Sequence, residues 1–245
     1  MWKNISAERS ESYIERHFGL KGKDTSEVSR KPTVTIAREE GAGGLTVASN
    51  LAEYLQKRVS SHDVWTVFSQ RLVAKVLEDH HLDKRAADFM KEGHKGVVTD
   101  AVEELLGLHP SNWTFVQRTN ATILRLAQEG NVILVGRGAN VVTSKLQTVF
   151  HVYLVGTLEK RIEQAQIVFN LDRKSAVNYI KKKDEARRRY VKDNFDKDID
   201  DPLLYHIIIN TDLVRHDEAA RLIGDEVIRR FKLDSPVKTM ANGNR

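Results

Sequence analysis

The chain of 245 residues is 40% hydrophobic and 30% charged, which is the composition of an ordinary globular domain, and it carries a net charge of +5. No apolar run approaches the roughly 20 residues of a membrane-spanning helix, the first residues lack the apolar core of a signal peptide, and the absence of cysteine excludes disulfides and thiolate metal sites. We therefore expect a cytoplasmic protein without a membrane partner, whose positive charge suits anionic ligands.

The first 32 residues are predicted to be an extension of the folded domain. Residues 7–18 have the composition of a short charged helix, and residues 21–32 form a polar linker that ends at a helix-breaking proline, Pro32. The folded domain is expected to begin at Thr33.

A strand, a glycine-rich turn and a helix follow in immediate succession. Residues 33–37 are β-branched and apolar, as in a strand buried on both faces, and apolar residues from Thr46 onwards recur with helical spacing. Between them, Gly41, Gly43 and Gly44 permit backbone angles and close approaches that side chains forbid. Free N–H groups and the positive end of a helix dipole then point at one spot, so this segment predicts a phosphate-binding loop.

The loop departs from the common pattern G-x-x-x-x-G-K-S/T at its charged positions. Arg38 stands at the first glycine, Gly44 at the phosphate-binding lysine and Leu45 at the magnesium-binding hydroxyl, although Thr46 offers a hydroxyl one residue later. The segment is therefore interpreted as a degenerate phosphate loop. The alternative is a tight strand-to-helix turn without a ligand, since such turns are frequent in α/β proteins.

The rest of the chain alternates strands with helices. Alternation of this kind is typical of a mainly parallel sheet with helices on both faces, so we expect a three-layer α/β fold. Strands are predicted at 63–68, 132–135, 149–155 and 206–209, and helices at 71–78, 112–129, 158–169, 173–190 and 217–231. The composition of residues 79–111 predicts a small helical insertion, and that of residues 234–245 predicts a loose tail.

A second basic feature follows the strand predicted at 132–135. In such a sheet, ligands bind beyond the carboxyl ends of the strands. The turn Gly136-Arg137-Gly138 brings an arginine to the same edge as the glycine loop, where a guanidinium can bind a phosphate in a bidentate manner. The alternative is a solvated arginine in a glycine turn, but the shared edge favours the phosphate.

The third basic feature is the run from Lys181 to Tyr190. Asp184 is expected to pair with Arg187 at i+3 or Arg188 at i+4, which holds guanidinium groups in set directions. A basic helix that closes over the site would neutralise a phosphoryl group in transfer and exclude water. A solvated charged face is the alternative. A nucleic-acid-binding protein is a less favoured class, because acidic residues are interspersed and no aromatic stacking platform accompanies the run.

Several short motifs occur in an order that resembles the cytidylate kinase-like family, a branch of the phosphate-loop nucleoside monophosphate kinases. They are Ile36 to Gly44, Val132 to Ala139, Val152 to Val155 with Arg161, Lys183 to Arg187 with Tyr190, and Asp201 to Tyr205 leading to Ile209 to Thr211. Members of this branch usually carry a double glycine in place of the catalytic lysine, as at Gly43-Gly44. They often continue with an arginine, where this chain has Leu45.

The resemblance implies a P-loop kinase domain over residues 33–233, with an acceptor-binding insertion at 69–111 and a lid at 170–200. ATP and its phosphates would be bound by the loop and by residues after the last strand, namely Arg38, Gly41, Gly43, Gly44, Thr46, Asn210 and Thr211. The acceptor would be contacted by Arg71, Arg137 and Arg161. The catalytic groups of the lid would be Asp184, Arg187 and Arg188, and Thr46 would contact Mg²⁺.

The implied reaction is transfer of the γ-phosphoryl group from Mg-ATP to a nucleoside monophosphate resembling CMP, or to a related small acceptor. Arg38 or a lid arginine would stand in for the missing lysine. The alternative is a nucleotide-binding regulatory module that has kept the fold without catalysis, which Gly44 and Leu45 favour.

Overall fold

The computed structural model describes residues 31–59, 64–69, 112–136 and 138–233. They form an α/β fold around a five-stranded parallel sheet with the strand order β2-β3-β1-β4-β5. The predicted α/β class with a parallel sheet is thereby confirmed. The strands are β1 (Thr33–Arg38), β2 (Thr66–Ser69), β3 (Val132–Val135), β4 (Val149–Val155) and β5 (Ile207–Asn210).

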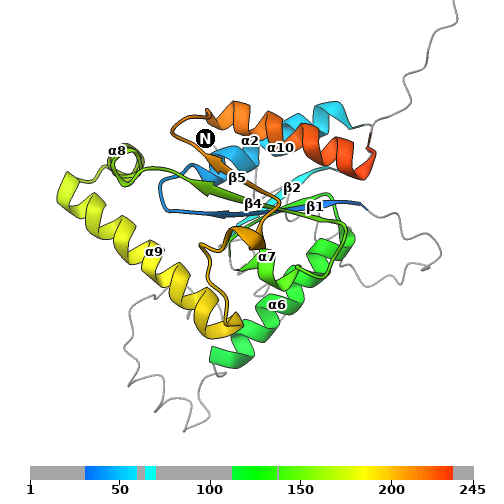
Figure 1. Cartoon of the computed structure of the whole chain (residues 1–245), viewed down its shortest axis with the longest axis horizontal. Helices are drawn as coiled ribbons and strands as arrows, with labels where there is room; N and C mark the ends of the chain where they lie inside the picture. Colours follow the sequence, from blue (N-terminus) through cyan, green and yellow to red (C-terminus); the bar gives the residue numbers. More distant parts are fainter. Residues whose placement is uncertain (1–30, 60–63, 70–111, 137, 234–245) are drawn as a thin grey trace, which may run out of the picture.

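Helices cover both faces of the sheet (Figure 1). On one face α2 (Gly44–Arg58) packs along α10 (His216–Phe231), and on the other lie α6 (Asn112–Glu129) and the short α7 (Ala139–Val142). A helical pair, α8 (Leu158–Phe169) and α9 (Arg173–Phe195), lies together at one end of the sheet, and the 3₁₀ helix η1 (Pro202–Leu204) precedes β5. None of the helices within the described ranges is long and apolar enough to cross a membrane.

The main hydrophobic core lies between the sheet and the α2–α10 pair. Val47, Leu51 and Leu55 repeat every four residues on the buried face of α2, and Ile223 and Val227 meet them from α10. Full burial of one such side chain contributes about 1.5–3 kcal/mol. This packing fixes the start of α2 relative to β1, and therefore fixes the loop between them.

The pair α8 and α9 is held together by a smaller apolar cluster of its own, formed by Ile162, Ala165, Ala176 and Ile180. Polar residues delimit both helices. Asp172 caps the start of α9 by accepting from the Ser175 N–H at 3.0 Å, and Asn170 ends α8 in a left-handed conformation with φ 51°. The two helices therefore form one unit that is tied to the rest of the domain largely by the polar contacts described below.

The observed bounds differ from the predicted ones mainly at helix ends. α9 runs to Phe195 rather than to residue 190, because its left-handed C-cap is Asp196. α2 begins at Gly44, two residues before the predicted start, and neither α7 nor η1 was predicted, since so few residues give no periodicity. The predicted elements at 7–18, 71–78 and 79–111 and the tail at 234–245 lie outside the described residues.

The strand register brings the loops of the site together. Ile36 of β1 lies opposite Val135 of β3 and Val152 of β4, so these strands end at nearly the same level. The segments that follow them meet at what we call the carboxyl edge of the sheet. The opposite end, where β4 and β5 begin, is the amino edge.

Candidate functional site

The glycine loop joins β1 to α2 at the carboxyl edge. Gly41 and Gly43 have φ values of 86° and 77°, and Gly43 is the left-handed N-cap of α2. The first intrahelical bond runs from the Val47 N–H to the Gly43 carbonyl, at 2.9 Å. The N–H groups of residues 44–46 lie in the first turn and have no intrahelical acceptor. These N–H groups lie where the sequence predicts an anion-binding cradle, and binding of an anion by them stays a prediction.

Each glycine of the loop faces a different part of the protein. A Cβ atom on Gly41 would lie 2.7 Å from the Arg161 carbonyl oxygen, and one on Gly43 would overlap the imidazole of His216. A Cβ atom on Gly44 would lie 2.9 Å from Cγ of Arg38. The loop therefore needs glycine for close packing as well as for its backbone angles.

The side chain of Arg38 spans the mouth of the loop. Its Cγ and Cδ atoms cover Gly44, and its guanidinium reaches Gly136 after β3, where a Cβ atom would overlap it. A side chain on residue 44 would have to pass through the space that the stem of Arg38 fills. The aliphatic stem of Arg38 therefore covers position 44, and its guanidinium lies at the carboxyl edge beside Gly136.

Asp184 joins α9, which includes most of the predicted lid, to the glycine loop. It is only 8% exposed, and it accepts hydrogen bonds from the Glu40 N–H at 2.8 Å, from Arg161 at 2.6 Å and from Arg187 at 3.0 Å. The predicted i+3 pair of Asp184 with Arg187 is confirmed. Arg187 also forms an ion pair with the carboxylate of Glu40, inside the loop itself.

Arg161 is the second buried charge of this network and is 7% exposed. Besides Asp184, its guanidinium donates to the carbonyls of Gly156 and Glu40, at 3.0 and 3.1 Å, and lies 3.3 Å from the Glu39 carboxylate. Glu39 in turn accepts from the Gly156 N–H at 3.0 Å. Arg161 therefore fastens the loop to the start of α8, and its contact with an acceptor stays a prediction.

Arg188 takes a different partner from Arg187. Its Nε donates to Asp200 at 2.8 Å, and Asp200 also accepts from the hydroxyl of Tyr153 at 2.7 Å. Burial opposes ionisation of Asp200, but the hydrogen bonds from Arg188 and Tyr153 outweigh it and lower the pKa of this carboxyl. The bond to Asp200 raises the pKa of Arg188 in return, so Arg188 is held charged beside the site.

A small cavity lies between α9 and the carboxyl edge, with a volume of about 200 Å³. Three cationic side chains, Arg38, Lys183 and Arg187, line it, and none of its described lining residues is Asp or Glu. The backbone of Gly136 and Gly138 forms another part of the wall. An anionic group is therefore the ligand that suits this space.

His216 is a residue of this site that the sequence did not single out. It is the first residue of α10, and its ring packs against Gly43 at the start of α2. Burial lowers the pKa of His216, against a smaller opposing effect of Asp217. Nothing in the local sequence signals this position, because it depends on how α10 packs along α2.

The other predicted residues are placed as follows. Thr46 is exposed in the first turn of α2, and its contact with Mg²⁺ stays a prediction. Asn210 and Thr211 shape the turn after β5, since Asn210 accepts from the Asp212 N–H at 2.9 Å and Thr211 donates to the Val155 carbonyl at 3.1 Å. Arg71 and Arg137 lie outside the described residues. Within the described ranges no three His, Asp or Glu side chains are grouped to hold a metal ion.

Several solved structures share the fold of this chain. Among solved structures, an uncharacterised protein from Eubacterium ventriosum aligns over 80% of this chain and 98% of its own, with 20% identity and a TM-score of 0.59. Shikimate kinases from Bacteroides thetaiotaomicron and Acinetobacter baumannii align over 81% and 83% of this chain and 98% and 96% of their own, at 14% and 20% identity and TM-scores of 0.47 and 0.46. Likeness at such identities concerns the fold alone.

No curated protein is significantly similar to this chain in sequence. The sequence profile of the cytidylate kinase-like family matches residues 33–213, which is most of the described domain. The chain therefore belongs to the cytidylate kinase-like family.

Proposed function

We propose that the protein transfers the γ-phosphoryl group of Mg-ATP to a nucleoside monophosphate resembling CMP, or to a related small acceptor. Membership of the family supports a kinase of the nucleotide type. The observation that carries the proposal is the course of Arg38 across Gly44, because it supplies a cation at the loop in spite of the missing lysine.

The donor phosphates would bind at the glycine loop. The N–H groups in the first turn of α2 would donate to them, and the guanidinium of Arg38, whose stem crosses Gly44, would approach them from the side of Gly136. A guanidinium is a planar fork and an ammonium is a compact point charge, so this site would bind phosphate in a bidentate manner rather than copy the lysine geometry.

The acceptor would approach from the small cavity beneath α9. Arg38 belongs both to the loop and to the lining of this cavity, so it lies where donor and acceptor would meet. Transfer in line needs positioning and neutralisation of charge more than covalent catalysis. Arg187 and Lys183, from the cavity side, would provide that neutralisation, and Arg188 would add charge nearby.

Few protein groups are needed to bind magnesium at this site. Mg²⁺ usually keeps several waters and binds one or two protein oxygens together with substrate phosphates, so a single hydroxyl at Thr46 suffices. When bound, the ion would neutralise charge on the phosphates. The carboxylates nearest the loop, Glu39 and Glu40, are paired with Arg161 and Arg187, so they would serve the ion only after leaving these partners.

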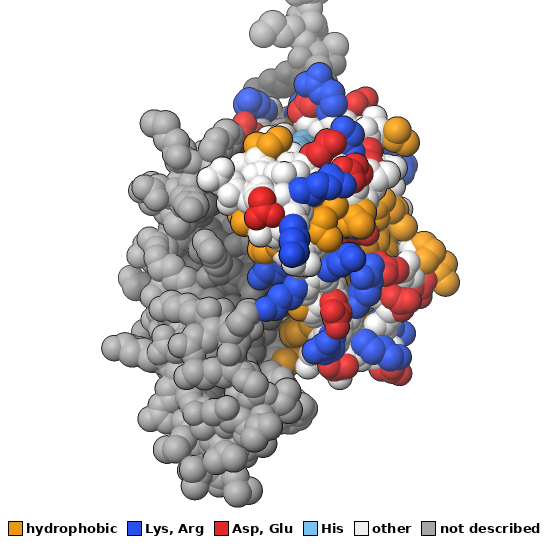
Figure 2. Space-filling view, turned by 90° about the vertical axis from the view of Figure 1, so that its left-hand side faces the viewer, with side chains coloured by type: hydrophobic (Ala, Val, Ile, Leu, Met, Phe, Trp, Pro, Cys, Tyr) orange, Lys and Arg blue, Asp and Glu red, His pale blue; other side chains and the backbone are white. Residues whose placement is uncertain are grey.

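One observation favours a second candidate, a nucleotide-binding module without catalysis. Arg187 is held by Glu40 and Asp184, so it must exchange the Glu40 carboxylate for a phosphate before it can act in transfer. A nucleic-acid-binding role has less support. Lys/Arg and Asp/Glu side chains are intermingled on the face around α8 and α9 (Figure 2), and Arg189 and Lys192 pair with acidic residues of their own helix or its cap.

A thermal-shift panel with a coupled ADP-release assay tests the proposal. Ligands that bind the native state raise stability by RT ln(1 + [L]/Kd), so ATP with magnesium should raise the Tm. ADP release should then occur with one or a few monophosphates. Gly43→Val is the control, because a side chain there meets His216 and blocks the backbone from phosphate. A Tm shift without turnover favours the module, and a shift that persists in Gly43→Val excludes the loop as the binding site.

A further inference from the structure

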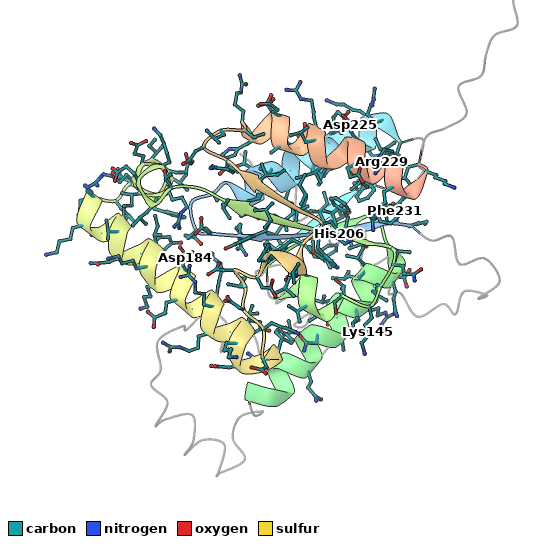
Figure 3. The ribbon with its side chains drawn as sticks, in the orientation of Figure 1. Lys145, Asp184, His206, Asp225, Arg229 and Phe231 are labelled. Carbon is teal, nitrogen blue, oxygen red and sulfur yellow. The ribbon has the colours of Figure 1, made fainter. Side chains whose placement is uncertain are left out.

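A second cavity, larger than the first, lies at the amino edge of the sheet. Its volume is about 850 Å³, within the roughly 300–1,000 Å³ of small-molecule sites. It is formed by the segment 144–147 before β4, the start of β4, the segment 203–206 before β5, and the end of α10. In Figure 3, Lys145, His206 and Phe231 of its lining lie on the right of the molecule, whereas Asp184 of the first site lies on the left.

The charge of this amino-edge cavity is positive. Lys145 and Arg230 line it, and none of the described lining residues is Asp or Glu. The charge of Arg230 adds to burial in lowering the pKa of His206, against a smaller opposing effect of Glu226. Glu226 itself is engaged by Arg229, with two contacts of 2.7 Å. The wall therefore offers cations whose charge no lining carboxylate neutralises.

Hydrogen bonds fix the orientation of the histidine in this wall. The N–H of His151 donates to Nδ1 of His206 at 2.9 Å, so the proton of the neutral His206 ring is on Nε2, which is then a donor. His151 shares a hydrogen bond of 2.8 Å with Thr35 of the neighbouring strand. The ring of His206 also stacks on Phe150, with centroids 4.9 Å apart. The donor is thus pre-oriented by the sheet.

Apolar surface completes the cavity. Leu203 is 89% exposed although it is a large hydrophobic residue, and Leu204, Leu146, Tyr205 and Phe231 add further apolar lining. Arg230 is held over the face of Phe150, with its guanidinium carbon 6.0 Å from the ring centroid. A ligand that suits this cavity has an anionic head for the two cations and an apolar body for the leucine and aromatic side chains.

The geometry points to a second binding site, separate from the phosphate loop, which takes a small organic anion with an aromatic or branched apolar body. Lys145, Arg230 and Nε2 of His206 hold the anionic head, and Leu203 and Phe231 cover the body. The residues that would hold the ligand come from the amino edge, so the site does not depend on the proposed phosphotransfer, although Asn140 of α7 lines both cavities.

The test uses the full-length protein and 2-naphthoate, a fluorescent aromatic carboxylate. We expect binding that shifts the His206 Hε1 signal in NMR spectra, assigned with His206→Asn, and that persists when pyrophosphate fills the phosphate loop. Arg230→Gln and Lys145→Gln should each weaken binding about tenfold, the loss of one charge-assisted contact. Arg229→Gln is the matched control, since Arg229 neighbours Arg230 on α10 but pairs with Glu226 and does not line the cavity.

Three results would overturn the inference. One is no binding at about 1 mM probe. Another is displacement of the probe by pyrophosphate when the probe causes no shift of the His206 Hε1 signal, which would place the probe at the glycine loop. The last is equal affinity in Lys145→Gln, Arg230→Gln and Arg229→Gln. Lys145 is exposed in a loop, so its variant remains informative if Arg230→Gln, which loses the contact with Phe150, fails to fold.

Discussion

The two faces of α9 both carry ion pairs, but those of the inward face are largely buried and those of the outward face are exposed to solvent. On the inward face, Asp184 and Arg187 pair with residues of the glycine loop and α8 and are largely buried. On the outward face, Arg189 pairs with Glu185 one turn away, and both side chains are more than two-thirds exposed, at 68% and 69%. Loss of one partner of a buried pair strands a charge away from water, whereas loss of an exposed partner leaves a charge that water solvates. The inward face therefore holds α9 against the glycine loop, and the outward face mainly keeps the helix solvated.

The largest expected effect comes from Asp184→Asn. This change leaves the buried guanidinium of Arg161 and the partly buried one of Arg187 without their shared carboxylate, and it should lower the free energy of unfolding by about 3–5 kcal/mol. Urea unfolding measures the loss. Glu185→Gln, the next residue on the same helix, should cost about 0.5 kcal/mol or less. Similar losses in the two variants would remove the distinction between the faces.

His151 is a buried ionisable group that lacks a carboxylate partner among the described residues. It therefore shows what burial alone does to a charge, in contrast to the paired charges of α9. It is 6% exposed, and burial, aided by His206 and Arg230, lowers its pKa from 6.5 to about 4. Between these two values the unfolded chain binds a proton that the folded chain does not. Stability should therefore fall by about 3 kcal/mol as the pH drops from 6.5 to 4.

Unfolding experiments across that pH range, on the native protein and on His151→Gln, measure this contribution. Loss of the bond to Thr35 lowers the stability of the variant at every pH, but the dependence of its stability on pH between 6.5 and 4 should be much flatter. An equally steep dependence in both proteins would assign the acid sensitivity to other groups.

The third effect concerns rate. If Arg187 exchanges Glu40 for a phosphoryl group in transfer, Arg187→Gln should lower kcat about a hundredfold and change ATP affinity far less. Arg189→Gln, from the outward face, should leave both unchanged. Equal losses of affinity and rate in Arg187→Gln would mean that Arg187 binds the ground state.

The smallest effect is expected at position 44. Gly44→Lys places a Cβ atom 2.9 Å from Cγ of Arg38 and a second cation beside its guanidinium, so ATP affinity should fall about tenfold rather than rise. The double variant Arg38→Ala/Gly44→Lys should recover affinity, because the lysine then has the space to itself. Isothermal titration with ATP measures both. A gain in the single variant would mean that the loop is an eroded lysine site and that Arg38 does not replace it.

The sequence allowed the sheet, the glycine loop and the Asp184–Arg187 pair to be predicted, because each leaves a local pattern: β-branched runs, clustered glycines, or charges at i+3. The sequence could not predict which residues pair with one another in the network around Asp184. Glu40 and Arg187 are 147 positions apart, and their contact follows from the sheet order and the docking of α9. For the same reason, the charged run from Lys181 to Tyr190 did not reveal which of its side chains face the sheet. Arg188 pairs with Asp200 and not with Asp184.

The most direct test of the central claim, that a guanidinium from the end of β1 serves where lysine is absent, is ADP release by Arg38→Met. Methionine keeps an unbranched stem over Gly44 and removes the charge. The account predicts that the native protein turns over ATP with a nucleoside monophosphate, that Arg38→Met loses about a hundredfold or more in kcat/KM, and that Arg189→Met does not. Turnover in Arg38→Met equal to that of the native protein would contradict the claim.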